Sequence, residues 1–187
     1  MSFDFSTLIT DRTTADVETV KSLLAKPVSQ WTAAEMEAFL AAALRGAYNV
    51  SDLNRVTAAV EALSGEFVGR GYQNPYTPVY AAEGRTEWRA GDEPTVSQMA
   101  GYLSNVRRLR ETLVSDLPYP PDNMDGLTVE KANTIEKILR ETERIIGLID
   151  KSVVMSETPS IGSASGEAEA YGATEYIGGS LVDYGET

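Results

Sequence analysis

The stretch TVEKANTIEKILRETERIIGLIDK, residues 128–151, has the longest helical periodicity in the chain and decides the fold class. Thr128 stands where a helix N-cap is expected, and apolar residues then recur at helical spacing. These residues are Ile135, Ile138, Leu139, Ile145, Ile146 and Ile149, with Thr142 between them. Each contributes roughly 1.5–3 kcal/mol when fully buried. Because such a face cannot stay in water, the stretch predicts a long helix that packs on something.

Two kinds of packing would cover this face. The helix can dock on the one that ends near Leu113 as an antiparallel hairpin, or it can pair with copies of itself in an oligomer. β-Branched residues at these positions suit both arrangements. We take four of the isoleucines as predicted contacts with a partner or a second copy. They are Ile135, Ile138, Ile145 and Ile149.

Two shorter helices are predicted near the N-terminus. The first is capped by Thr13 or Thr14 and stops at Pro27. The second begins with a capping box formed by Thr32 and Glu35, and we expect Gly46 to end it in a left-handed conformation. Its apolar stripe consists of Met36, Phe39, Leu40, Ala43 and Leu44.

Two more helices fill the middle of the chain. Asn49 or Ser51 can start one that runs to about Gly69, and Thr95 with Gln98 starts the next with another capping box. The sequence therefore predicts a mainly α protein of about five helices. We expect an extended N-terminal lead over residues 1–12, a helical domain over 13–155 and a separate C-terminal arm over 156–187.

A long loop rich in glycine and proline is predicted over residues 71–94. It contains four aromatic residues, Tyr72, Tyr76, Tyr80 and Trp88. A loop of this length in a compact domain is usually functional or packed against something. The aromatic side chains can complete the core, or they can form a second contact surface or a platform that stacks on a sugar ring.

Composition narrows the classes of function. The 187 residues include 28 acidic and 16 basic side chains, so the net charge is 16 − 28 = −12, and there is neither Cys nor His. No Ser/His/Asp or Cys/His nucleophile pair, thiolate or imidazole metal site, or disulfide can form. The acidic surplus argues against nucleic-acid binding, because phosphate contacts need clustered Lys and Arg. No stretch predicts a membrane span or a signal peptide.

Carboxylate pairs are the remaining catalytic candidates. A glycosidase needs two facing acids, one with a pKa raised by burial. The sequence offers Glu35 with Glu37, Asp92 with Glu93, and Asp122 with Asp125, none of them in an apolar context. Only Glu83 and Glu87 lie beside an aromatic residue, Trp88. We therefore expect no enzyme and no cofactor or metal, and a carboxylate hydrolase is the weakest of the functions considered.

The C-terminal arm, residues 156–187, has a composition of its own. It holds six acidic residues and no basic one, so it carries half of the net charge, and it is rich in Gly, Ser and Tyr. Such a segment is expected to be disordered unless a partner orders it. The predicted anchors, which can add short strands to a neighbouring chain, include Tyr171, Tyr176, Leu181 and Tyr184.

A succession of segments resembles a known group of proteins. The segments are LITDRTTADV (8–17), WTAAE (31–35), GAYN (46–49), DLNRV (52–56), TEW (86–88), YLSNV (102–106), MDGLT (124–128), AN (132–133) and IE (135–136). In this order they resemble small structural proteins from the tail and baseplate modules of phages and prophages of gut Firmicutes. The resemblance spans about residues 8–150.

The resemblance implies a non-enzymatic virion protein, associated with the tail tip, baseplate or fibre and made in the host cytoplasm. It implies other virion proteins and copies of this chain as partners, and neither nucleic acid nor a membrane. The short acidic arm leaves no room for a receptor-binding domain. The alternative is a glycan-binding adsorption module that uses the aromatic loop from Tyr72 to Trp88.

Overall fold

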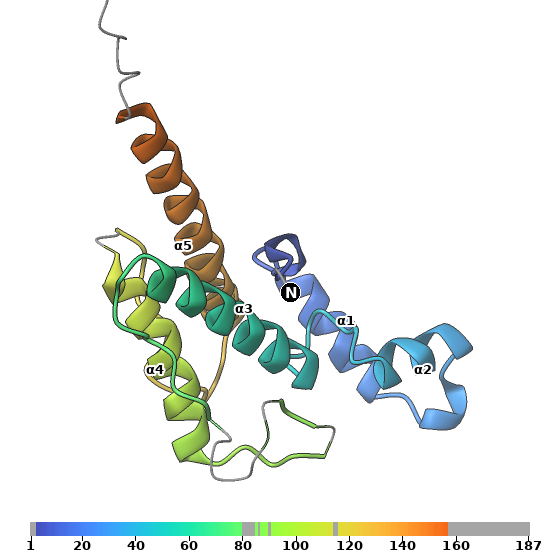
Figure 1. Ribbon diagram of the computed structural model, residues 1–187. Coiled ribbons are helices and arrows are strands. Elements are labelled where there is room, and N and C mark those ends of the chain that lie inside the picture. Colours follow the sequence, from blue (N-terminus) through green and yellow to red (C-terminus); the bar gives the residue numbers. More distant parts are fainter. Residues whose placement is uncertain (1–2, 80–84, 86, 90, 114–115, 157–187) are drawn as a thin grey trace, which may run out of the picture.

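The computed structural model describes residues 3–79, 85, 87–89, 91–113 and 116–156, and the fold is mainly α, as the sequence predicts (Figure 1). The α-helices in these ranges are α1 (Thr14–Leu24), α2 (Ala33–Leu40), α3 (Val50–Gly69), α4 (Val96–Thr112) and α5 (Val129–Ser156). Two short 3-10 helices, η1 (Phe5–Thr7) and η2 (Val28–Gln30), lie on either side of α1. No strand occurs within the described ranges.

The helix starts follow the capping residues in the sequence. Four helices begin with a side chain that accepts a hydrogen bond from the first turn, while a first-turn side chain accepts one from the cap residue. The four N-caps are Thr13, Thr32, Asn49 and Thr95. Thr128 accepts a hydrogen bond from the backbone N–H of Lys131, as expected at the start of α5. Local sequence therefore sets where these helices begin.

The core lies between α3, α4 and α5, which contact one another in all three pairs. Among its fully buried side chains are Val56 and Phe67 of α3, Leu109 of α4, and Ile135 and Ile138 of α5. The apolar face of α5 therefore packs inside its own chain, against two helices rather than one. α1 and α2 lie to one side of this bundle (Figure 1).

The N-terminal lead, for which the sequence predicts an extended segment, packs against the helical domain. Leu8 is buried in the same core cluster as α3, α4 and α5, and Phe3 and Phe5 pack partly against it. Part of the lead forms η1, and Arg12 is also buried. Residues 3–12 therefore belong to the domain.

The prediction for α2 is partly wrong, because the helix ends at Leu40, well before Gly46. Ala42 takes the left-handed conformation (φ 50°) that ends many helices. The backbone N–H of Ala43 donates to the carbonyl of Ala38 and that of Ala42 to Phe39, the two bonds of a Schellman motif. The predicted stripe is not buried: the exposed fractions of Phe39 and Leu40 are 45% and 75%.

Gly46 has a different role from the one predicted. A Cβ atom at this position would lie 2.1 Å from the carbonyl oxygen of Asp16 and 2.6 Å from the backbone nitrogen of Val17. No side chain fits there, because real Cβ contacts are longer than 3.0 Å. Gly46 therefore lets the chain cross closely over the first turn of α1.

Candidate functional site

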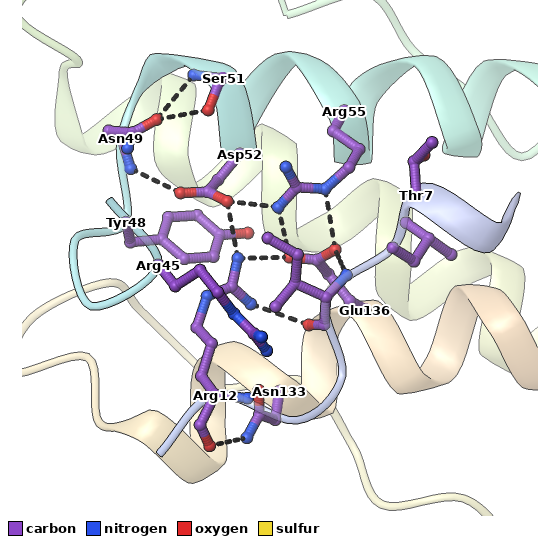
Figure 2. A network of polar contacts seen from close by, with 12 residues as sticks. Thr7, Arg12, Arg45, Tyr48, Asn49, Ser51, Asp52, Arg55, Asn133 and Glu136 are labelled. Atoms are coloured by element: carbon purple, nitrogen blue, oxygen red, sulfur yellow. Dashed lines mark hydrogen bonds and ion pairs between the residues drawn. The ribbon is translucent and has the colours of Figure 1, made fainter. Parts of the chain in front are cut away.

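Three buried charged side chains and one half-buried one, that of Arg55, meet where the N-terminal lead contacts α3 and α5 (Figure 2). Arg12 comes from the lead, Asp52 and Arg55 from α3, and Glu136 from α5. Nη2 of Arg12 lies 2.6 Å from Oδ1 of Asp52 and 2.7 Å from Oε1 of Glu136. Nη2 of Arg55 lies 2.9 Å from Oε1 of Glu136 and also contacts Asp52. We call this group the ion cluster.

The ion cluster also fastens the backbone of the N-terminal lead to α5. The backbone N–H of Ile9 donates to Oε2 of Glu136 at 2.6 Å. The backbone N–H of Arg12 donates to Oδ1 of Asn133 at 2.9 Å, and the Asn133 side-chain amide donates to the Arg12 carbonyl at 2.9 Å. These bonds join residues more than 120 positions apart, so they fix the lead against the N-terminal part of α5.

The charges in the ion cluster balance. Asp52 and Glu136 each accept hydrogen bonds from both Arg12 and Arg55, so two positive charges face two negative ones. Burial opposes the charge of Arg55, but its bonds to Glu136 and Asp52 outweigh this penalty and raise its pKa above the usual value. A network of paired opposite charges of this kind connects the elements that contribute to it.

Two tyrosines cover one side of the ion cluster. The hydroxyls of Tyr48 and Tyr102 lie 2.6 Å apart and share a hydrogen bond, and the guanidinium of Arg12 lies 5.3 Å from the centre of the Tyr48 ring. Burial raises the pKa of both tyrosines above the usual value. Both hydroxyls therefore stay protonated at neutral pH and serve as hydrogen-bonding groups.

One carboxylate of each of the three candidate pairs forms a surface ion pair. Glu35 binds Lys26 at 2.7 Å, Asp92 binds Arg85 at 2.7 Å, and Asp122 binds Arg107 at 3.0 Å. The hydrogen bond from Lys26 and those from Thr32 lower the pKa of Glu35 to about 2. The hydrogen bond from Arg85 likewise lowers the pKa of Asp92. Both shifts are opposite to the raised pKa that a general acid needs.

No metal site or membrane-spanning helix is found in the described part of the chain. Among these residues, no three acidic side chains are grouped in a way that could hold a metal ion. None of the helices described above has an apolar stretch that could span a bilayer. Of the two candidate carboxylates near Trp88, Glu87 is exposed and Glu83 lies outside the described residues.

The aromatic loop does not form the predicted contact surface as a whole. Trp88 is only 3% exposed and belongs to the core, and the side-chain amide of Asn54 bonds to its backbone N–H at 2.7 Å and its carbonyl at 2.9 Å. Tyr76 packs partly against the core. Tyr72 is 47% exposed, with its ring set edge-on to Phe67. Trp88 therefore cannot stack on a sugar ring, because its faces are covered.

Two of the four isoleucines predicted as partner contacts are core residues instead. Ile135 and Ile138 have no exposed surface, because α3 and α4 cover that part of α5. Ile145 and Ile149 are partly buried at the edge of the core. Leu148, which the sequence did not single out, is 46% exposed. Of the four predicted isoleucines, only Ile145 and Ile149 therefore keep surface that another chain could contact.

The last turns of α5 extend beyond the bundle (Figure 1). Arg70, which follows α3, binds Asp150 at 2.7 Å near the point where α5 leaves the other helices. The predicted anchors of the C-terminal arm and one residue of the aromatic loop lie outside the described residues. These are Tyr171, Tyr176, Leu181, Tyr184 and Tyr80.

Comparisons of the chain with protein-family models, with curated proteins and with solved structures found no match.

Proposed function

We propose that this chain is a non-enzymatic structural protein of a phage virion, associated with the tail, baseplate or fibre. It acts by subunit assembly through the C-terminal half of α5 and the C-terminal arm. Its partners are copies of itself and other virion proteins, and it resides in the virion after synthesis in the host cytoplasm.

The observation that carries this proposal is the exposure of the end of α5. Leu148 is 46% exposed, Ile145 and Ile149 are only partly buried, and the helix continues past the bundle to Ser156. This apolar surface near the projecting end of α5 is available for contact with another chain. The acidic arm follows α5 directly in the sequence.

The ion cluster supports the same proposal. It joins the N-terminal lead, α3 and α5 through buried bonds, which makes a firm base for the projecting helix. Its residues also fall within the segments that carry the resemblance: Arg12 in LITDRTTADV, Asp52 and Arg55 in DLNRV, and Glu136 in IE. A protein that shares these segments would share the connections that hold α5.

The virion assignment is tested on purified particles. Tail-bearing particles from cells that carry the gene should be separated by density and analysed by quantitative mass spectrometry. We expect this chain at a fixed ratio to a major tail protein, with an abundant soluble host protein as the control for carry-over. A chain that is present in the lysate but depleted from particles as strongly as the host control would contradict the proposal.

A further inference from the structure

The face of α5 that points away from the core carries a line of basic side chains. Lys137, Arg140, Arg144 and Lys151 are spaced by three, four and seven residues, which places them on one side of a helix. All four are exposed, and the exposed Leu148 lies in the same line. We call these five residues the basic stripe.

Most of this positive charge is not neutralised by its neighbours. Lys137 and Lys151 form no ion pair with any described residue. Arg140 donates to Oγ1 of Thr10 and to the carbonyl of Leu8, both of which are uncharged acceptors. Arg144 binds Glu141, an acidic side chain at the margin of the stripe. Four basic residues against one acid give a local excess on a chain with a net charge of −12.

The same chain contains a segment of the opposite charge. Residues 157–187 hold six acidic side chains and no basic one. The three tyrosines of this segment, Tyr171, Tyr176 and Tyr184, add rings that can stack on guanidinium groups. The segment begins six residues after Lys151, so each copy of the chain brings one basic stripe and one acidic segment.

We propose that the basic stripe of one copy binds residues 157–187 of a second copy. Carboxylates of the segment pair with Lys137, Arg140 and Lys151, and a tyrosine ring covers Leu148. This inference rests on the proposed assembly function and names the surface that receives the arm. Because the stripe and the segment are different surfaces, the contact is heterologous and can repeat from copy to copy into a ring or a fibre.

The absence of cysteine from the chain makes a direct test possible. Three single-cysteine variants are needed: Ser152→Cys beside the stripe, Ser180→Cys in the acidic segment, and Ser22→Cys on an exposed face of α1. A mixture of the Ser152→Cys and Ser180→Cys chains, treated with a short bismaleimide, should give a cross-linked heterodimer. The matched mixture of Ser22→Cys and Ser180→Cys should give little product, because α1 lies away from the stripe.

Charge reversal tests whether the stripe is responsible. Lys137→Glu combined with Lys151→Glu, placed in the Ser152→Cys chain, should lower the yield at least about tenfold, because attraction becomes repulsion. Lys131→Glu is the matched control, since Lys131 is exposed on α5 but lies outside the stripe. Raising the salt to about 0.5 M should also lower the yield of the unmodified stripe. A yield unchanged by the double reversal would overturn the proposal.

The remaining outcomes separate this inference from the proposed function. If the double-cysteine chain Ser152→Cys/Ser180→Cys cross-links only within itself, the segment docks on its own α5 and the contact between copies is wrong. If the chain is found in particles or forms oligomers without any cross-link at the stripe, the inference fails while the assembly function stands. If the chain is absent from particles yet the cross-link forms, the virion assignment fails and the contact stands.

Discussion

Glu136 and Lys137 are neighbours in sequence but lie on different faces of α5. Glu136 has no exposed surface and accepts hydrogen bonds from two arginines and one backbone N–H. Lys137 is exposed and pairs with no described residue. The first charge is fully used inside the fold, whereas the second is available to another molecule.

This difference separates structural charges from charges that can recognise a partner. Buried charges are costly unless paired, so the ion cluster specifies where the N-terminal lead and α3 meet α5. Exposed charges contribute little to stability, so Lys137 and Lys151 of the basic stripe can change without changing the fold. One helix thus serves as the anchor of the domain on one face and as the proposed contact surface on the other.

Removing a charge from the ion cluster should have the largest effect on the free energy of unfolding. Glu136→Gln leaves Arg12 and Arg55 short of a carboxylate in a buried site, and we expect a loss of about 3–5 kcal/mol in the free energy of unfolding. Urea titration measures this loss. Glu143→Gln, an exposed change on the same helix, should stay within about 0.5 kcal/mol. Equal midpoints for the two variants would mean that the ion cluster does not hold the fold.

A smaller loss of stability is expected when the close crossing of Gly46 over the first turn of α1 is disturbed. Gly46→Ala places a Cβ against the backbone of Asp16, and we expect a loss of about 1–3 kcal/mol as the chain moves apart. Gly65→Ala is the matched control, because a Cβ there meets nothing within 4 Å inside α3. The control should be neutral or stabilising by up to about 1 kcal/mol. Thermal unfolding of both variants decides whether the close crossing is required.

The surface ion pair of Glu35 with Lys26 should make a smaller contribution to stability, and this contribution depends on pH. The folded pKa of about 2 lies below the unfolded value, so the contribution of Glu35 is present above about pH 4.5 and is lost as the pH falls towards 2. Glu35→Gln should therefore be less stable than the wild type at pH 6 and equally stable near pH 2. Urea midpoints measured across this range check the sign. A stability difference between the two proteins that grows as the pH falls would refute this sign.

Replacing an exposed lysine of the basic stripe should affect stability least. Lys137→Glu is expected to shift the free energy of unfolding by less than about 0.5 kcal/mol, since no described partner is lost. The same variant should weaken self-association, which sedimentation velocity measures. A variant that unfolds more easily than this would show that Lys137 has a structural role, and the contrast between the two faces of α5 would no longer hold.

The sequence predicts the helices well where local chemistry decides. The N-caps of α1 to α4 and the apolar periodicity of α5 are short-range patterns, and both appear in the structure. The end of α2 is missed, because Ala42 adopts a left-handed conformation for which glycine is the usual residue. The role of Gly46 is missed because Asp16, the residue it approaches, is 30 positions away.

The ion cluster could not be predicted from one sequence. Its members are separated by up to 124 positions, and charged residues are normally assigned to the surface. The only local signal is the spacing of Asp52 and Arg55, which suits an ion pair on a helix but says nothing of burial. Trp88 is similar: its burial depends on Asn54, 34 positions earlier, whose amide holds the loop backbone in place.

The most direct test of the account is the molar mass of the purified chain in solution. Light scattering during gel filtration should be recorded for the full chain and for a chain that lacks residues 157–187. The account predicts an oligomer for the full chain and a monomer for the shortened one. The same mass for both chains would contradict assembly through the C-terminal arm.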